Sequence, residues 1–231
     1  MTDARRHFHD ELAQLKDRLL DMSSLSEEAL ARAVRALLDR DEQAAEAVIV
    51  ADRNVDALEI EIEDTVTHLL ALHQPMARDL RLLLSALKNA DDLERVGDHA
   101  VNIAQAAKRL TAHRLIPPEP ELLEMARIAR EMLASALEAF VRGDSKAGRA
   151  VCARDDEVDR LNQSLFRILL THMAEDPHTI GAAMQLLLVG RNLERVADLA
   201  TNIAENVVFL VEGKSIKHRV EEHQEMGTRV P

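Results

Sequence analysis

The sequence predicts an all-α protein made of two tandem, pseudo-symmetric three-helix bundles, with six long antiparallel helices in total. A duplication supports the two bundles: residues 90–104 (ADDLERVGDHAVNIA) recur at 190–204 (GRNLERVADLATNIA), with nine of the fifteen positions identical. Composition supports the helices, because 47% of the residues are hydrophobic while only 2% are aromatic, and Gly and Pro are scarce. Long packed helices have this composition, whereas strands are richer in aromatic residues.

The first half contains three segments with apolar residues at helical spacing. We expect helices at residues 3–40, 42–72 and 77–110. A break at Ser23–Ser26 is an alternative for the first segment, since serine can cap a helix, but a single long helix is favoured. A polar turn at residues 39–41 and a second turn at Pro75 separate the three helices.

The second half repeats this order after a proline-rich linker at Pro117–Pro120. We expect helices at residues 121–142, 144–173 and 180–211. Gly143, Pro177 and Gly213 lie where these helices should end or begin. The predicted domains are therefore residues 1–115 and 116–213, followed by a polar C-terminal tail, residues 214–231, which we expect to be mobile.

Acidic residues occur as four pairs at i, i+4 spacing, which places both carboxylates of a pair on one side of a helix. The pairs are Asp52/Asp56, Glu94/Asp98, Asp155/Asp159 and Glu194/Asp198. Leucines share their side of the helix, so we expect these acids to face inward. Gly97, and Ala197 at the equivalent position, should let a neighbouring helix approach closely.

Turn symmetry predicts which pairs meet. Helices joined by a short turn are antiparallel neighbours, so residues equally distant from the turn lie side by side. Asp52 and Asp98 are equally distant from Pro75, and so are Asp56 and Glu94. The second-half pairs are placed in the same way about the turn at Asp176–Pro177. We therefore expect two quartets of carboxylates.

A multivalent cation would relieve the repulsion within each quartet. Oxygen ligands suit hard or borderline ions such as iron, manganese, magnesium or zinc. A ferritin-like oxidase is disfavoured, because neither repeat contains the Glu-x-x-His pair of that di-iron site. The alternative is that Arg95, Arg195 or other basic residues neutralise the acids in interhelical salt bridges.

The side of each repeat opposite the acids is apolar, which predicts that it packs against another helix. Val96 and Ile103, with their second-half counterparts, project away from the acids, so the other bundle or a partner should cover them. His99 has no histidine counterpart at position 199 and is expected on the surface. Cys152 is interpreted as a small core residue.

The net charge of −12 argues against nucleic acid as a partner, since phosphate binding depends on basic patches. No apolar run reaches the ~20 residues of a membrane-spanning helix, and the N-terminal residues do not resemble a signal peptide. We expect a cytoplasmic protein with at most peripheral membrane association through partners.

The chain resembles the PhoU family of phosphate-transport accessory proteins from His9 to about Glu212. The shared marks are EEAL at Glu27, the pair Asp52/Asp56, QP.A.DLR at residues 74–81, and DLER.GDHA.NIA in the first repeat. The resemblance implies two three-helix bundles whose repeated acidic motifs bind multinuclear iron or zinc clusters in some members. Those motifs fall on the eight acids named above.

The resemblance also implies a negative regulator of the phosphate-starvation response that modulates high-affinity uptake. Its implied partners are the ATPase subunit of the phosphate ABC transporter and a membrane sensor histidine kinase, and a homodimer is expected. No catalytic residue is expected, because the chain lacks an evident nucleophile, a phosphate-cradling glycine loop or an acid/base dyad. Two alternatives stay open: a metal-dependent hydrolase or oxidase that uses the same carboxylates, and a helical scaffold without metal.

Overall fold

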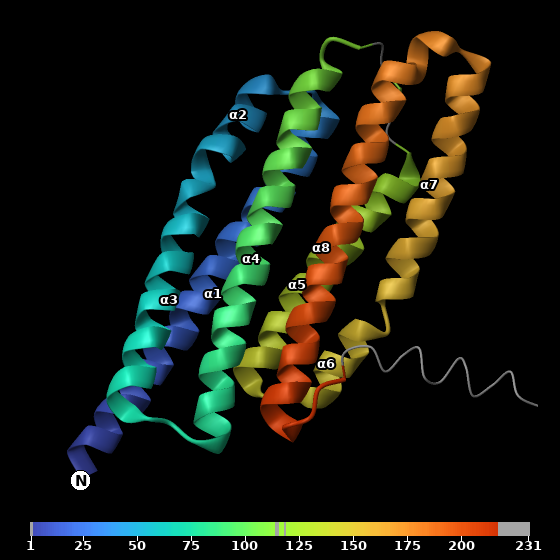
Figure 1. Ribbon diagram of the computed structural model, residues 1–231. Helices are drawn as coiled ribbons and strands as arrows, with labels where there is room; N and C mark the ends of the chain where they lie inside the picture. The colour runs from blue at the N-terminus through green and yellow to red at the C-terminus, as the bar shows by residue number, and fades with distance from the viewer. Residues whose placement is uncertain (1, 114–115, 118, 217–231) are drawn as a thin grey trace, which may run out of the picture.

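The computed structural model describes residues 2–113, 116–117 and 119–216, and every regular element in this part of the chain is helical. The elements are α1 (Thr2–Asp39), α2 (Glu42–Ala51), α3 (Arg53–His73), α4 (Ala77–Leu110), α5 (Pro120–Arg142), α6 (Ser145–Cys152), α7 (Asp155–Glu175), the short 3-10 helix η1 (Pro177–Thr179) and α8 (Ile180–Glu212) (Figure 1). The predicted all-α class is confirmed. Residues 217–231 of the predicted tail lie outside the described residues.

Helix α1 continues through the serines at which a break was an alternative. Ser26 is completely buried, and its hydroxyl lies 2.9 Å from the carbonyl oxygen of Met22 and 3.1 Å from that of Leu93. The hydroxyl therefore bonds the preceding turn of its own helix and the backbone of α4, instead of capping a new helix.

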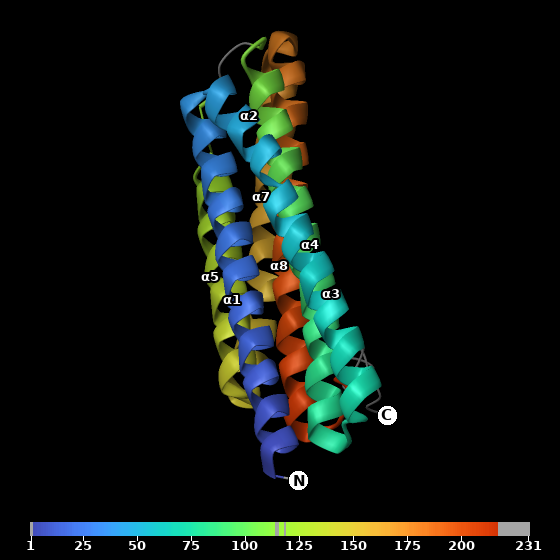
Figure 2. The ribbon, with the colours of Figure 1, turned by 90° about the vertical axis from the view of Figure 1, so that its left-hand side faces the viewer.

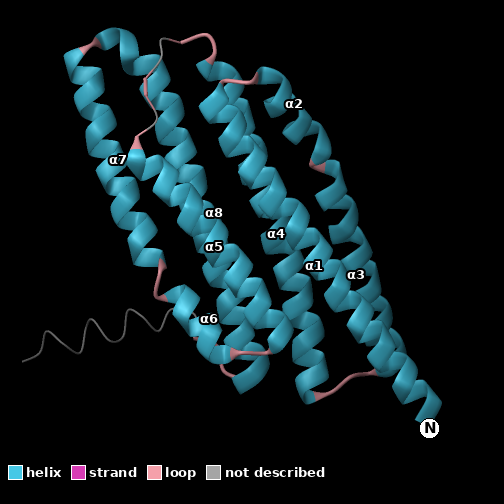
Figure 3. Cartoon of the chain, turned by 180° about the vertical axis from the view of Figure 1, so that it is seen from behind, coloured by secondary structure: helices cyan, strands magenta, loops and turns pink. Residues whose placement is uncertain are grey.

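The helices predicted at 42–72 and 144–173 are each divided in two, so their prediction as single helices is wrong. The first is interrupted at Asp52 and the second at Ala153–Arg154, as Figure 3 shows. At each break a backbone hydrogen bond spans three residues, whereas an α-helix uses four. The Val55 amide donates to the Asp52 carbonyl at 2.7 Å, and the Arg154 amide donates to the Val151 carbonyl at 2.9 Å. Neither Gly nor Pro stands at either break.

The helices form two layers, which Figure 2 shows from the side. Helices α1 and α5 lie next to each other behind a layer that contains α3, α4, α8 and α7. Within that layer α4 and α8 run antiparallel and form the largest contact between any two elements (Figure 1). The two halves are therefore joined along their repeated helices.

The α4–α8 contact covers the apolar side of both repeats. Val96, Ile103, Val196 and Ile203 are all completely buried, and they belong to one core that runs through both halves. The sequence left open whether the other bundle or a partner protein covers these residues, and in the structure the other bundle covers them. The boundary between the predicted domains, near residue 115, stays a prediction.

Polar pairs cross the same contact. The Asn206 amide donates to the Asn89 side-chain oxygen at 2.8 Å, and Asn202 lies 3.4 Å from a carboxylate oxygen of Asp92. Asp92 follows Asn89 on α4, whereas its partner Asn202 precedes Asn206 on α8, as antiparallel packing requires. Among the described residues, none of the helices is long and apolar enough to cross a membrane.

Candidate functional site

The first quartet lies where the hairpin of α3 and α4 brings its acids together. Asp52 stands at the start of α3, and burial together with the charges of Asp56 and Asp98 raises its pKa to about 6. Burial and the charges of Asp98, Glu59, Asp56 and Asp52 raise the pKa of Glu94 to about 7. The acids of α3 thus repel those of α4, as the turn symmetry predicts.

Gly97 sets how closely Asp52 approaches α4. A Cβ atom at position 97 would lie 2.8 Å from Oδ1 of Asp52 and 3.5 Å from Cγ1 of Val55. The close approach expected at Gly97 therefore occurs, and the side chains of Asp52 and Val55 are the groups that approach it. A methyl group there would require the Asp52 carboxylate to move.

The second quartet has the same arrangement on α7 and α8. Burial and the charges of Asp198, Asp159, Asp156 and Glu194 raise the pKa of Asp155 to about 6. Burial, Asp198 and Asp156 also raise the pKa of Asp159. This quartet has a basic neighbour, because Arg195 donates to a carboxylate oxygen of Asp198 at 3.1 Å.

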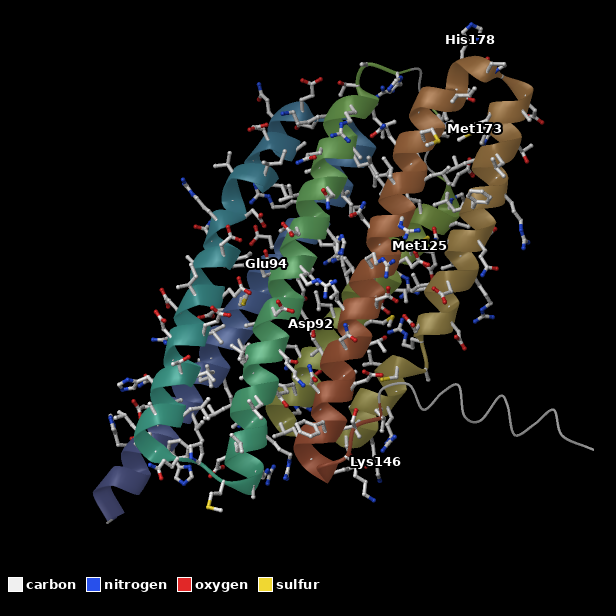
Figure 4. All side chains as sticks on the ribbon, in the orientation of Figure 1. Asp92, Glu94, Met125, Lys146, Met173 and His178 are labelled. Atoms are coloured by element: carbon white, nitrogen blue, oxygen red, sulfur yellow. The ribbon has the colours of Figure 1, made fainter. Side chains whose placement is uncertain are left out.

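The acids stand at exposed or half-buried positions, so their predicted inward orientation is only partly correct. Asp56 and Asp98 are exposed, and the other six members of the quartets are half-buried. The hairpins pack through apolar residues such as Val55 and Leu93, which leaves the carboxylates at the edge of each contact. In Figure 4, Glu94 lies on the side of α4 next to α3.

The carboxylates of the two quartets have ligand chemistry that suits a cation. Their donor set consists of oxygen atoms only, and burial together with the charges of neighbouring acids raises the pKa values of Asp52, Glu94 and Asp155, a cost that a cation would relieve. In the part of the chain that the structure describes, however, no three Asp, Glu, His or Cys side chains converge as metal ligands. The ligand chemistry fits a hard cation, and binding would require the side chains to draw together.

Basic residues neutralise the acids of the quartets only in part, which was the alternative to a bound cation. The bond from Arg195 to Asp198 lies within α8, between exposed or half-exposed side chains, and such pairs contribute at most about 1 kcal/mol. Arg95 makes no ion pair with any described residue. Glu131 of α5, an acid outside the quartets, forms ion pairs with Arg127 and Arg154.

A polar cavity of about 280 Å³ lies between α4 and α8 beside the second quartet. Arg95, His99 and Arg195 line it together with Asp155 and Asp198. His99 is half-buried, and its Nδ1 lies 2.9 Å from the side-chain oxygen of Asn192. The expectation of a surface position for His99 is therefore wrong, because α8 covers the side of α4 on which it stands.

The sequence-based reasoning missed the pairs Asn89/Asn206 and Asp92/Asn202. Turn symmetry relates residues only within a hairpin, and no short turn connects α4 to α8. Pairing these residues from the sequence requires knowing that the two repeats contact each other.

Comparison with known proteins identifies the family. The model of the PhoU domain matches twice, at residues 19–107 and 122–207. The chain belongs to the PhoU family. Each of the two PhoU domain matches spans one complete quartet.

Relatives match over nearly the whole chain. A phosphate-specific transport system accessory protein PhoU homolog from Clostridium acetobutylicum is 37% identical over 213 residues, covering 92% of this chain and 97% of the relative. A homolog with the same description from Caulobacter vibrioides is 39% identical over 212 residues, covering 91% and 92% of the two chains. PhoU proteins are accessory and regulatory proteins, not enzymes, and this chain shares that character.

Two solved PhoU structures have the same fold. PhoU from Pseudomonas aeruginosa superposes with a TM-score of 0.86 at 36% identity, covering 90% of this chain and 100% of that one. The phosphate transport system regulatory protein PhoU from Streptococcus pneumoniae has a TM-score of 0.85 at 31% identity, covering 91% and 99%.

Proposed function

We propose that this protein is a cytoplasmic regulatory adaptor of phosphate homeostasis, which represses the phosphate-starvation response and modulates high-affinity phosphate uptake. The observation that carries the proposal is the double match to the PhoU domain, with a full quartet in each half. The names of the relatives, an accessory protein of phosphate-specific transport and a phosphate transport regulatory protein, support the same role.

The proposed partners are the ATPase subunit of the phosphate transporter and a membrane sensor histidine kinase. Long exposed helical faces suit an adaptor, because they offer extended surfaces for docking. The quartets stand on the hairpins of α3 with α4 and of α7 with α8, and Glu94 of the first quartet is labelled in Figure 4. A homodimer is also expected, and sedimentation of the purified protein tests it.

Each quartet is proposed to bind a multivalent cation, with multinuclear iron or zinc first and manganese or magnesium as further candidates. Asp52, Asp56, Glu94 and Asp98 would hold the ion in the first half. Asp155, Asp159, Glu194 and Asp198 would hold it in the second. The bound ion would supply positive charge that ties α3 to α4 and α7 to α8, and so would stabilise the face used for docking.

Deletion of the gene tests the regulatory role. In phosphate-rich medium the deletion strain should express alkaline phosphatase constitutively, and the intact gene should restore repression. Normal repression in the deletion strain would contradict the proposal. Purified protein should bind the transporter ATPase without turning over phosphoesters or oxidising Fe(II).

Elemental analysis of protein purified without chelator tests the metal sites. The double variant Asp52→Asn/Asp98→Asn should lose the metal of the first half and keep that of the second, and Asp155→Asn/Asp198→Asn should do the reverse. These changes preserve side-chain size, so circular dichroism should be unchanged. Equal metal content in all three proteins would contradict the proposed sites.

A further inference from the structure

A groove between α7 and α8 has no role in the proposed metal sites. It encloses about 540 Å³ and lies beyond the second quartet, towards the η1 turn. Phe166, Met184, Leu187 and Leu188 form its apolar lining, and Arg167 and Arg191 lie at its edges. We refer to it as the Phe166 groove. Helices α7 and α8, which form its two sides, are seen in Figure 1.

The apolar side chains of the groove are unusually accessible. Phe166 is 50% exposed, Met184 47% and Leu188 42%. Leu170 and Ile180, each 45% exposed, continue the apolar surface towards the turn. Contiguous apolar surface of this kind is characteristic of a site where another molecule binds.

The duplicated first half shows that the fold does not require an apolar surface here. At the positions equivalent to Phe166, Arg167 and Arg191, the first half has Glu63, Asp64 and Asp91, and Lys88 stands in place of Leu188. The same helical hairpin is therefore compatible with a charged groove. Leu84 and Leu87 do stand in place of Met184 and Leu187, so the second half differs in Phe166, Leu188 and the sign of the neighbouring charges.

Charge indicates the kind of partner. The chain has a net charge of −12, yet the side chains lining the Phe166 groove include two arginines and no acid. Neither arginine makes an ion pair with a described residue. Both guanidinium groups are therefore free to pair with acidic groups on a partner.

We infer that the Phe166 groove binds an amphipathic helix of a partner protein, with the apolar side of that helix against Phe166, Met184 and Leu188 and acidic residues along its edges. Amphipathic helices are recognised by hydrophobic grooves that accept their apolar side. The inference rests on the proposed adaptor role, because it assigns that role a docking surface. Its test uses purified components, so it can fail independently of the alkaline phosphatase experiment.

Synthetic peptides provide the test. The protein has no Trp and no Tyr, so the fluorescence of a single Trp on the apolar side of a peptide reports binding without background. Three peptides are compared: one with an acidic polar face, one with the same apolar face and a basic polar face, and a scrambled acidic peptide. The acidic amphipathic peptide should bind most tightly, and added salt should weaken its binding.

Substitutions that introduce the equivalent first-half residues test the groove, and a substitution in the first half serves as the control. Phe166→Glu should lower the affinity for the acidic peptide by about tenfold or more, a loss typical of a central anchor residue. Arg167→Asp/Arg191→Asp should shift the preference to the basic peptide. Leu84→Ala, at the first-half position equivalent to Met184, should change neither affinity. Circular dichroism checks that each variant is folded.

Three outcomes would overturn the inference. One is equal affinity for the acidic and basic peptides, and another is an affinity for the acidic peptide that Phe166→Glu leaves unchanged. The third is a concentration-dependent dimer, seen by sedimentation, that Phe166→Glu dissociates and the acidic peptide does not, because the groove would then bind a second copy of the chain.

Discussion

Glu94 shows how the quartets respond to pH. Its pKa of about 7, against an ordinary value of 4.5, means that the folded protein binds this proton more tightly than the unfolded chain does. The pKa values of Asp52 and Asp155, raised to about 6 from 3.8, act in the same direction. Their contribution to stability is fully present below about pH 4 and is lost as the pH rises through 6 and 7.

The metal-free protein should therefore be more stable at pH 5 than at pH 7.5. Urea unfolding in the presence of chelator measures the difference. Glu94→Gln should raise the free energy of unfolding at pH 7.5 and reduce the dependence on pH, because one repelled charge is removed. A hydrogen bond from Arg127 lowers the pKa of Glu124 from its ordinary 4.5, so Glu124→Gln should leave the change in stability between these two pH values as it is in the unmodified protein. A stability that rises from pH 5 to pH 7.5 would contradict the assignment.

Gly97 and Ala197 occupy equivalent positions in the two repeats, so exchanging Gly and Ala at each position measures the same effect in opposite directions. Ala is favoured over Gly in a helix by about 1 kcal/mol, and the atom that a Cβ would meet at position 97 belongs to the rotatable carboxylate of Asp52. Gly97→Ala should thus leave the free energy of unfolding unchanged or raise it by up to about 1 kcal/mol. Ala197→Gly should lower it by a similar amount. A clear loss of stability in Gly97→Ala would mean that the position of Asp52 is fixed by its surroundings.

At the scale of helices, the sequence predicts where chains turn better than where helices break. The turns at residues 39–41, Pro75 and Pro177 follow from the sequence because Asp and Pro act through local backbone chemistry. The breaks at Asp52 and Ala153–Arg154 carry no such residue. They lie where α2 packs on α4 and α6 packs on α8, so tertiary packing determines them, and a pattern of apolar spacing does not record it.

The segments before the breaks begin with equivalent caps. A carboxylate oxygen of Asp41 accepts hydrogen bonds from the amides of Gln43 and Ala44 at 2.9 Å, and Asp144 makes the same contacts with Lys146 and Ala147 at 3.0 and 3.1 Å. Asp41→Ala and Asp144→Ala should each lower the free energy of unfolding by about 1 kcal/mol. Asp→Asn at either position should cost much less, because asparagine also caps. Chemical denaturation measures both, and equal losses for Ala and Asn would show that charge, not capping, matters.

At the scale of the whole molecule, antiparallel geometry explains both what could be predicted and what could not. Within each hairpin the turn fixes the register, so the partners of Asp52 and Asp155 followed from their distance to the turn. Helical periodicity gives the direction of a side chain but not its depth, so the open position of Asp56 and Asp98 could not be predicted. The contact between the repeats depends on how the halves dock, and no short turn connects α4 to α8.

This docking makes each half dependent on the other. Val96, Ala100 and Ile103 of α4 are completely buried, and removing the second half would expose them. A fragment of residues 1–115 should therefore self-associate or unfold with low cooperativity, as measured by sedimentation and by thermal circular dichroism. Mixing it with a fragment of residues 116–216 should restore a one-to-one complex with a single unfolding transition. A monomeric first fragment that unfolds cooperatively at the temperature of the full chain would show that the halves are independent domains, and that the α4–α8 contact contributes little to the stability of either.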